Sequence, residues 1–224
     1  MLGHRRSGVV GGAREAPVVV VRAADRRRGE DGLCCAMQVL GSGLSEAKHH
    51  EDALHVKEAQ LSMMRRLGDS EDNILGVQGN LSNTYSRLGR LEEALQMDRD
   101  IYCGRLKLNG EEHVRTLIAA NNYAASLLAL LHFEEAKSLL SKATPVARRA
   151  LGEDHIRTLK LRWSYAMALY EDPAATRDDF REAVTSLEEL ERTARRVFGG
   201  EHPTKQGIEL SLQNARAALR SRTE

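Results

Sequence analysis

Apolar residues recur along most of this chain at the spacing of amphipathic helices. Near the start, the intervals of four, three and four residues are set by Leu33, Met37, Leu40 and Leu44. The same intervals return near the end of the chain, at Ile208, Leu212, Ala215 and Leu219. An apolar stripe of this kind predicts a helix with one face against a core.

Between these two stripes the pattern continues and is interrupted at regular places, mostly by glycine. It predicts helices over about 33–44, 49–67, 72–88, 91–108, 113–130, 133–151, 155–170, 180–198 and 203–220. Gly68, Gly89 and Gly110 stand where helices should end, since glycine accepts the left-handed conformation that closes many helices. Pro145 falls inside a predicted helix and is expected to bend it. The segment 171–179 predicts a longer turn or an added helical turn.

The interruptions follow a repeat. The stretch GEEHVRTLIAANNYAASLLALLHFEEA, residues 110–136, recurs at Gly152 as GEDHIRTLKLRWSYAMALY, with weaker copies at Gly68 and Gly199. The copies are 42, 42 and 47 residues apart. Each period holds two helices of about 17 residues, a hairpin that cannot bury its apolar face alone. The sequence therefore predicts an all-α solenoid of stacked antiparallel hairpins.

The repeated motif resembles the tetratricopeptide repeat, and in particular the 42-residue type of kinesin light chains. The matching residues are Gly110, Glu111, His113, Thr116, Leu117, Asn122, Ala124, Phe133 and Ala136, and most recur 42 or 47 residues later. This resemblance implies a right-handed superhelix in which small residues such as Ala124 and Ala136 allow two helices to cross closely. The first hairpin lacks one residue and the fourth carries five extra ones. No heptad coiled coil precedes the repeats, which favours a general scaffold over a motor subunit.

The expected domains follow from the repeat. Residues 1–32 are rich in Arg and Gly and show no helical period, so they are predicted to be a disordered tail. The repeat domain should cover 33–220, divided at about 33–68, 69–110, 111–152 and 153–199, with a capping helix over 200–220. An organelle-targeting role for the tail is a weaker alternative, because the tail contains acids and few serines.

Composition narrows the function classes. The formal net charge of +1 gives no basic field for nucleic acid. Three cysteines, two of them adjacent, make no disulfide framework, which indicates a reducing, cytoplasmic location. No apolar run approaches the ~20 residues of a membrane span.

No motif predicts a catalytic, cofactor or metal site. His113, His155 and His202 recur three residues after a repeat glycine, so they are interpreted as parts of helix starts rather than as metal ligands. Arg192, Arg195 and Arg196 could bind an anion, but positive charge at the end of a helix is the simpler interpretation.

The resemblance places the first helix of each hairpin on a concave groove. The candidate groove residues are Asn80, Asn83, Arg87, Asn121, Asn122, Ala125, Lys160, Trp163, Ser164 and Met167. A carboxamide can pair with both N–H and C=O of an extended peptide, and Trp163 with Met167 could hold one anchor side chain. The alternatives are that Trp163 packs in the core and that Asn122 bonds a neighbouring helix.

The predicted function is therefore a non-enzymatic scaffold that binds a peptide segment of a partner protein. Capture of a C-terminal carboxylate is a weaker hypothesis, because only Arg87 and Lys160 supply positive charge among the candidates. Other possibilities are a kinesin light chain-like cargo adaptor, a fragment of a larger signalling protein, and self-association through the ends of the array.

Overall fold

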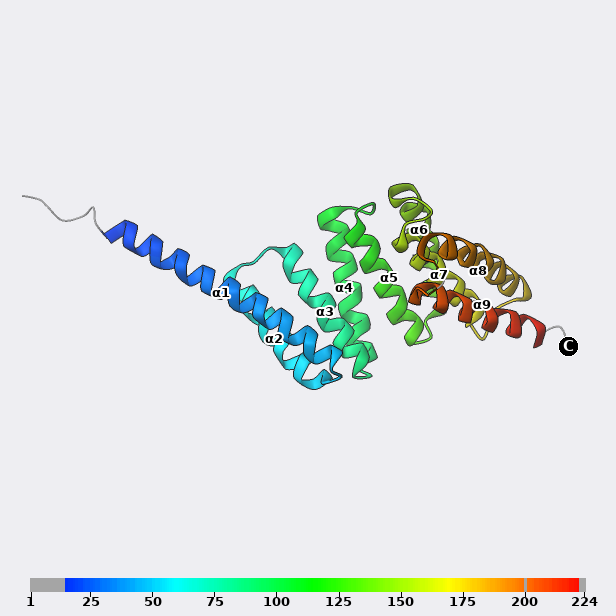
Figure 1. Cartoon of the computed structure of the whole chain (residues 1–224), viewed down its shortest axis with the longest axis horizontal. Helices are drawn as coiled ribbons and strands as arrows, with labels where there is room; N and C mark the ends of the chain where they lie inside the picture. The colour runs from blue at the N-terminus through cyan, green and yellow to red at the C-terminus, as the bar shows by residue number, and fades with distance from the viewer. Residues whose placement is uncertain (1–14, 200, 222–224) are drawn as a thin grey trace, which may run out of the picture. The chain divides into compact units, whose positions relative to one another are not determined.

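The computed structural model describes the backbone of residues 15–199 and 201–221, and their side chains from residue 29 onward except at 31. All regular secondary structure in this part is helical (Figure 1). The helices are α1 (Glu15–Glu46), α2 (His50–Leu67), α3 (Glu71–Arg87), α4 (Leu91–Asn109), α5 (Val114–Ala129), α6 (Phe133–Leu151), α7 (Ile156–Tyr170), α8 (Arg177–Phe198) and α9 (Pro203–Ser221). None of the described helices is both long enough and apolar enough to cross a membrane.

The predicted fold class is confirmed, and the predicted helix ends from residue 49 onward agree with the structure to within three residues. The reason is local: each second helix of a hairpin ends at a glycine with positive φ, at Gly68, Gly110, Gly152 and Gly199. Gly89 plays the same part between α3 and α4. Pro145 lies within α6, which runs on through it.

The first unit, residues 1–67, contains the antiparallel pair α1 and α2. Residues 1–14 of the predicted tail lie outside the described residues, and from Glu15 the backbone is helical, so residue 32 is not a boundary of the structure. The helical period starts later because α1 has 32 residues and α2 only 18. Since the two run antiparallel, α2 can face only about the last 18 residues of α1, and a stripe is required only there.

Contacts inside this first unit use polar side chains. Lys57 Nζ donates to Ser45 Oγ at 2.7 Å, and Gln60 Nε2 donates to the carbonyl of Cys34 at 3.2 Å. In contrast, Leu33 and Leu40 of the predicted stripe are 52% and 54% exposed. The helix was predicted, but only Met37 and Leu44 of the predicted stripe are partly buried.

The second unit, residues 68–224, stacks the hairpins α3–α4, α5–α6 and α7–α8, followed by α9. Its core consists of clusters that each join neighbouring helices. In one of them, Leu117, Ala124 and Leu127 of α5 pack with Ala136 and Leu140 of α6. Ala124 and Ala136 are fully buried, as expected where two helices cross closely. Overpacking such a crossing would cost roughly 1–3 kcal/mol.

The five-residue insertion of the fourth repeat is divided between a longer turn and a longer helix. The turn 171–176 replaces the three-residue turn 130–132, and α8 has 22 residues where α6 has 19. Thr176 caps α8: its hydroxyl accepts from the Asp179 N–H, and the Asp179 carboxylate accepts from the Thr176 N–H, a reciprocal capping box. Lys137 Nζ fastens the turn through Asp172 at 2.9 Å.

Candidate functional site

The first helices of successive hairpins, α3, α5, α7 and α9, meet one another at three joints. At the α5–α7 joint, Ser164 Oγ donates to Asn121 Oδ1 at 3.0 Å. At the α7–α9 joint, Trp163 Nε1 donates to Ser211 Oγ at 2.9 Å. Because the repeat periods are 42 and 47, both bonds join the same two positions of the repeat. We call this pair of positions the latch.

The α3–α5 joint has no latch. The equivalent positions there are Gly79 and Asn122. Gly79 has no side chain, and Asn122 has no hydrogen-bonding partner among the residues that the structure describes. The α5–α7 and α7–α9 pairs are in backbone proximity, whereas α3 and α5 make almost no such approach. Among these four helices, the stack is therefore open at the latch position between α3 and α5, which are linked instead by the ion pair of Arg115 with Asp72.

The opening forms a hollow of about 410 Å³. It is lined by Leu75, Gly76, Gly79, Asn80 and Asn83 of α3, Ile101 and Arg105 of α4, and Arg115, Ile118, Ala119 and Asn122 of α5. One repeat later, Ile118 and Asn121 stand where Gly76 and Gly79 stand in α3. The absence of two side chains thus leaves the space between α3 and α5. We call this hollow the groove.

One end of the groove is basic. Arg105, only 4% exposed, donates to the carboxylate of Asp72 and to its carbonyl at 2.8 Å. Arg115 reaches the same carboxylate. Burial raises the pKa of Asp72, but the two guanidinium groups outweigh it and hold that pKa below its ordinary value. Two arginines share one carboxylate, which leaves a positive charge at this end.

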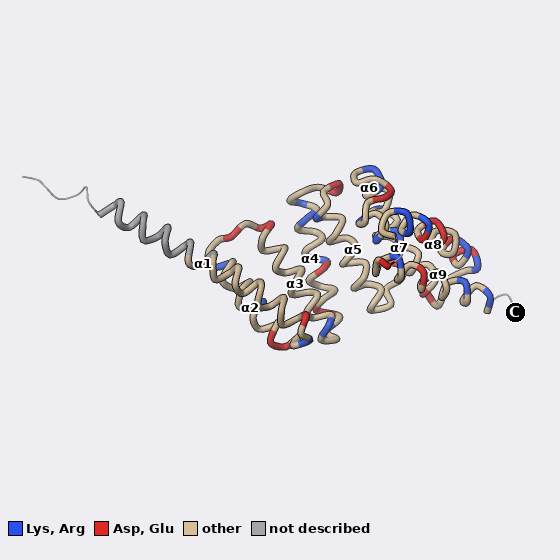
Figure 2. The backbone as a smooth tube through the Cα atoms, in the orientation of Figure 1, with Lys and Arg blue, Asp and Glu red and all other residues tan. Residues whose placement is uncertain are grey.

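The floor of the groove is apolar. Leu75, Ile101 and Ala119 form a buried cluster beneath it. The walls carry few charges: α3 has none between Asp72 and Arg87, and α5 has only Arg115, so both helices are mostly tan in Figure 2. Apolar floor, carboxamide rim and basic end together suit an extended segment with one anchor side chain.

The structure divides the predicted groove residues into three groups. Asn80, Asn83 and Asn122 line the groove, and Asn83 Nδ2 also donates to the Gly79 carbonyl at 3.0 Å. Asn121 and Ser164 latch α5 to α7, so the helix-to-helix bond considered for Asn122 belongs to its neighbour. Outside the lining of this groove lie the remaining five residues, Arg87, Ala125, Lys160, Trp163 and Met167.

Trp163 is a packing residue between α7 and α9, the alternative interpretation of the sequence. Its ring lies so close to Gly207 that a Cβ there would clash with it, and its indole bonds Ser211. It packs against the cluster that contains Leu159 and Ile208. Because Trp163 packs against α9, it does not form an open anchor pocket with Met167.

The repeated histidines cap helices. The Nδ1 atoms of His113, His155 and His202 accept from the backbone N–H two residues later, at 3.2, 3.1 and 3.1 Å. This explains their recurrence after each repeat glycine. Within the described residues, no group of three or more potential ligands is placed to hold a metal ion.

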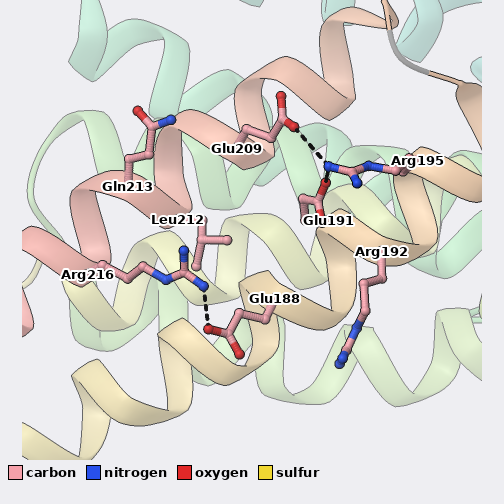
Figure 3. Close-up of a pocket in the computed structure, with 8 residues that line it drawn as sticks. All are labelled: Glu188, Glu191, Arg192, Arg195, Glu209, Leu212, Gln213 and Arg216. Atoms are coloured by element: carbon pink, nitrogen blue, oxygen red, sulfur yellow. Dashed lines mark hydrogen bonds and ion pairs between the residues drawn. The ribbon is translucent and has the colours of Figure 1, made fainter.

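A second hollow, of about 460 Å³, lies between α8 and α9 (Figure 3). Its charges are largely paired: Arg216 bonds Glu188 at 2.7 Å, and Arg195 bonds Glu191 at 2.6 Å. Arg196 of the predicted anion cluster pairs instead with Asp154. Of the three arginines that line it, Arg195 and Arg216 are already compensated by glutamates, which makes this hollow a poor anion site.

The same hollow lies on the side of α9 where a further helix of the repeat would pack. The four positions that face the partner helix in α5 are Leu117, Ala120, Ala124 and Leu127, and their equivalents in α9 are Gln206, Glu209, Gln213 and Arg216. All four α9 side chains are polar and only partly buried or exposed. A polar face of this kind is typical of the last helix of an array, and the capping role of α9 stays a prediction.

Sequence reasoning missed Gly76, Gly79, Arg105 and Arg115. The two glycines were missed because binding residues are sought among polar and aromatic side chains, whereas these positions matter because they have no side chain. A position-by-position comparison of the repeats contains the signal, since Gly76 and Gly79 align with Ile118 and Asn121.

Comparison with known proteins agrees with this architecture. The sequence model of the tetratricopeptide repeat family matches residues 73–148. A candidate kinesin light chain from Podosopora anserina with nearly identical TPR-like repeats has a TM-score of 0.68 and 20% identity, covering 84% of this chain and 87% of its own. BtubC (BKLC) from P. vanneervenii has a TM-score of 0.67 and 17% identity, covering 91% and 87%. Among curated proteins no match is found.

Proposed function

Because the chain is a tetratricopeptide repeat protein whose array has the kinesin light chain-like fold, we propose that it is a non-enzymatic scaffold that holds an extended segment of a partner protein in the groove between α3 and α5. The observation that carries the proposal is the hollow itself, lined by three carboxamides from two first helices. Tetratricopeptide repeats bind protein partners, which supports the general class; the peptide and its place are our proposal.

The groove offers each kind of contact that an extended peptide requires. The carboxamide of Asn122 can donate to a backbone carbonyl of the peptide and accept from one of its backbone N–H groups. Gly76 and Gly79 allow the peptide backbone to approach α3 closely, because no Cβ intervenes. The floor formed by Leu75 and Ile101 suits one apolar side chain, and Arg115 favours an acidic neighbour.

A selection experiment tests this function. A displayed library of random peptides is selected on the wild-type protein, and the recovered peptides are titrated by fluorescence anisotropy. We expect Asn122→Ala to weaken binding about tenfold, the effect of losing one or two net hydrogen bonds. The matched control Gln213→Ala removes an exposed carboxamide from α9 and should leave the affinity unchanged. Recovery of no binding peptide, or equal binding by Asn122→Ala, would contradict the proposal.

Narrower roles stay within this proposal. A kinesin light chain-like cargo adaptor would be one form of such a scaffold. A cytoplasmic location and self-association through the ends of the array stay predictions, and so does membership in a larger signalling protein.

A further inference from the structure

The three joints between first helices differ in a way that assigns the binding position. Two are closed by a latch, and the third has Gly79 where a latch residue belongs. We propose that, of these three joints, only the α3–α5 joint binds the peptide. A hydrogen-bonding group of the peptide takes the place of the missing side chain at position 79 and links α3 to α5. This inference rests on the proposed peptide-binding function.

Packing does not explain the glycines of α3. A Cβ built at Gly79 would meet no atom within 4 Å, and one at Gly76 would meet only Arg105 Nη2, at 3.8 Å. Elsewhere in the same unit packing does demand glycine: at Gly207 a Cβ would clash with Trp163, and at Gly104 it would lie 3.0 Å from Leu75. Glycine in the middle of a helix weakens that helix. Two glycines that packing does not require, both facing one hollow, indicate that the empty space serves a ligand.

Arg105 keeps the joint apart. The equivalent residues of the following hairpins are Ala147 and Ala194, both fully buried, and small residues there let neighbouring helices approach. Arg105 instead extends a guanidinium toward α3 and holds Asp72. A long side chain at an alanine position acts as a spacer. Arg105 therefore helps to keep α3 and α5 apart, in addition to the missing side chains at Gly76 and Gly79.

At the other joints the equivalent groups are already bonded to each other. The Asn121 oxygen already accepts from Ser164, and the indole N–H of Trp163 is already donated to Ser211. A ligand that takes the place of the latch at these joints would have to break an existing bond before making its own. At the α3–α5 joint it would only complete one, because Asn122 is unpaired among the described residues.

The geometry also gives the chemical class of the bound group. Asn122 offers both a donor and an acceptor, and Gly79 has no side chain to pair with either. A group placed over Gly79 that pairs with both must therefore supply an acceptor and a donor of its own. A backbone amide unit in extended conformation does so with N–H and C=O side by side. The partner is therefore an extended protein segment bound through its backbone at this joint, with specificity added by the apolar floor and the basic end.

Filling the joint tests the inference. Gly79→Asn restores a carboxamide at the latch position while keeping Asn122, and Ala125→Asn adds the same group to α5 at an exposed position outside the groove. The probes are the peptides selected on the wild-type protein from the random library. We expect Gly79→Asn to weaken binding by about tenfold or more and Ala125→Asn to change it less than about twofold.

Hydrogen–deuterium exchange supplies a readout that does not depend on affinity. Without peptide, Gly79→Asn should slow amide exchange in α3 and α5 relative to the wild type, because a latch now ties them. With peptide, the wild-type protein should gain protection in α3, α4 and α5 and not in α7–α9. Asn121→Ala, which opens the next joint, should leave peptide affinity unchanged.

The outcomes separate the two proposals. If selected peptides bind Gly79→Asn as tightly as the wild type, or protect α7–α9, the joint assignment is wrong while peptide binding stands. If no selected peptide binds the wild type, both proposals are wrong. Lost binding with slowed exchange in Gly79→Asn supports both.

Discussion

The hairpin α3–α4 and the hairpins α5–α6 and α7–α8 are copies of one repeat, but their interiors differ in polarity. Asp98 of α4, 5% exposed, occupies the position of Leu140 and Leu187, which are fully buried. Ser126 Oγ donates to Asp98 Oδ2 at 2.6 Å. In the next repeat the residue at the position of Ser126 is Ala168. One hairpin buries a carboxylate with hydroxyl partners where the others bury hydrocarbon.

This difference shows what the array allows. Each repeat of a solenoid contacts only its neighbours, so one hairpin can accept a less stable interior while the rest of the core stays apolar. The polar hairpin is also the one that borders the groove and contains Arg105 and the two groove glycines. We therefore expect α5–α9 to form the more stable part of the array, and the proposed binding surface lies between α3 and α5.

Transfer of the polar residue into an apolar hairpin should have the largest effect. Leu140→Asp would place a carboxylate where Ala124 and Ala168 offer no hydroxyl to donate, since they replace Ser82 and Ser126. We expect a loss of about 4 kcal/mol or more in the free energy of unfolding. Urea denaturation followed by circular dichroism measures it. Leu140→Met keeps the volume and should cost less than about 1.5 kcal/mol; equal losses in the two variants would refute the explanation from burial.

The reverse transfer should stabilise. Ser82→Ala/Asp98→Leu/Ser126→Ala gives these three positions, in α3, α4 and α5, the residues found one repeat later, Ala124, Leu140 and Ala168. Replacing a buried ionic group together with its partners by packed hydrocarbon commonly gains about 1–4 kcal/mol. The urea midpoint should rise at neutral pH. Asp98→Leu alone is the control and should gain less, because Ser126 and Ser82 would lose their acceptor; a lower midpoint in the triple variant would contradict this account.

The pH dependence of this gain follows from the carboxyl group. Burial raises the pKa of Asp98, and the hydrogen bonds from Ser126 and Ser82 only partly oppose that rise. The folded state therefore holds its proton more tightly than the unfolded state, and its stability increases as pH falls through the raised pKa. The triple variant lacks this group. The stability gap between variant and wild type should be widest at neutral pH and narrow toward the ordinary carboxyl pKa; a gap that widens on acidification would reverse the sign.

The sequence contained most of the fold and a smaller part of the site. Glycines with positive φ and apolar stripes are local signals, so helix ends such as that of α6 at Leu151 were predicted directly. The groove is not visible in local signals, because it emerges only when equivalent positions of the repeats are compared. Asn121 and Asn122 were both predicted groove residues, and only the bond of Asn121 to Ser164 in the structure distinguishes them. Trp163 had two credible roles because the position of α9, which decides between them, is not visible in local periodicity.

The smallest expected effect concerns the turns, where the α5–α6 hairpin has the less favourable residue and the α3–α4 hairpin the better one. The α3–α4 turn has Gly89 at φ 75°, and the equivalent residue of the α5–α6 turn is Leu131 at φ 63°. A side chain in this left-handed conformation costs about 1–2 kcal/mol, but glycine also loses more conformational freedom on folding, by roughly 0.5–1 kcal/mol. Leu131 is 69% exposed, so its removal sacrifices little burial. Leu131→Gly should therefore stabilise the protein by a net few tenths of a kcal/mol up to about 1 kcal/mol, measured by urea denaturation.

Two further variants serve as controls. Leu131→Asn should gain a similar amount, since asparagine tolerates this conformation with less freedom to lose, and Leu131→Ala should gain nothing. Equal gains for Ala and Gly would show that the exposed leucine, and not the backbone of the turn, carries the strain.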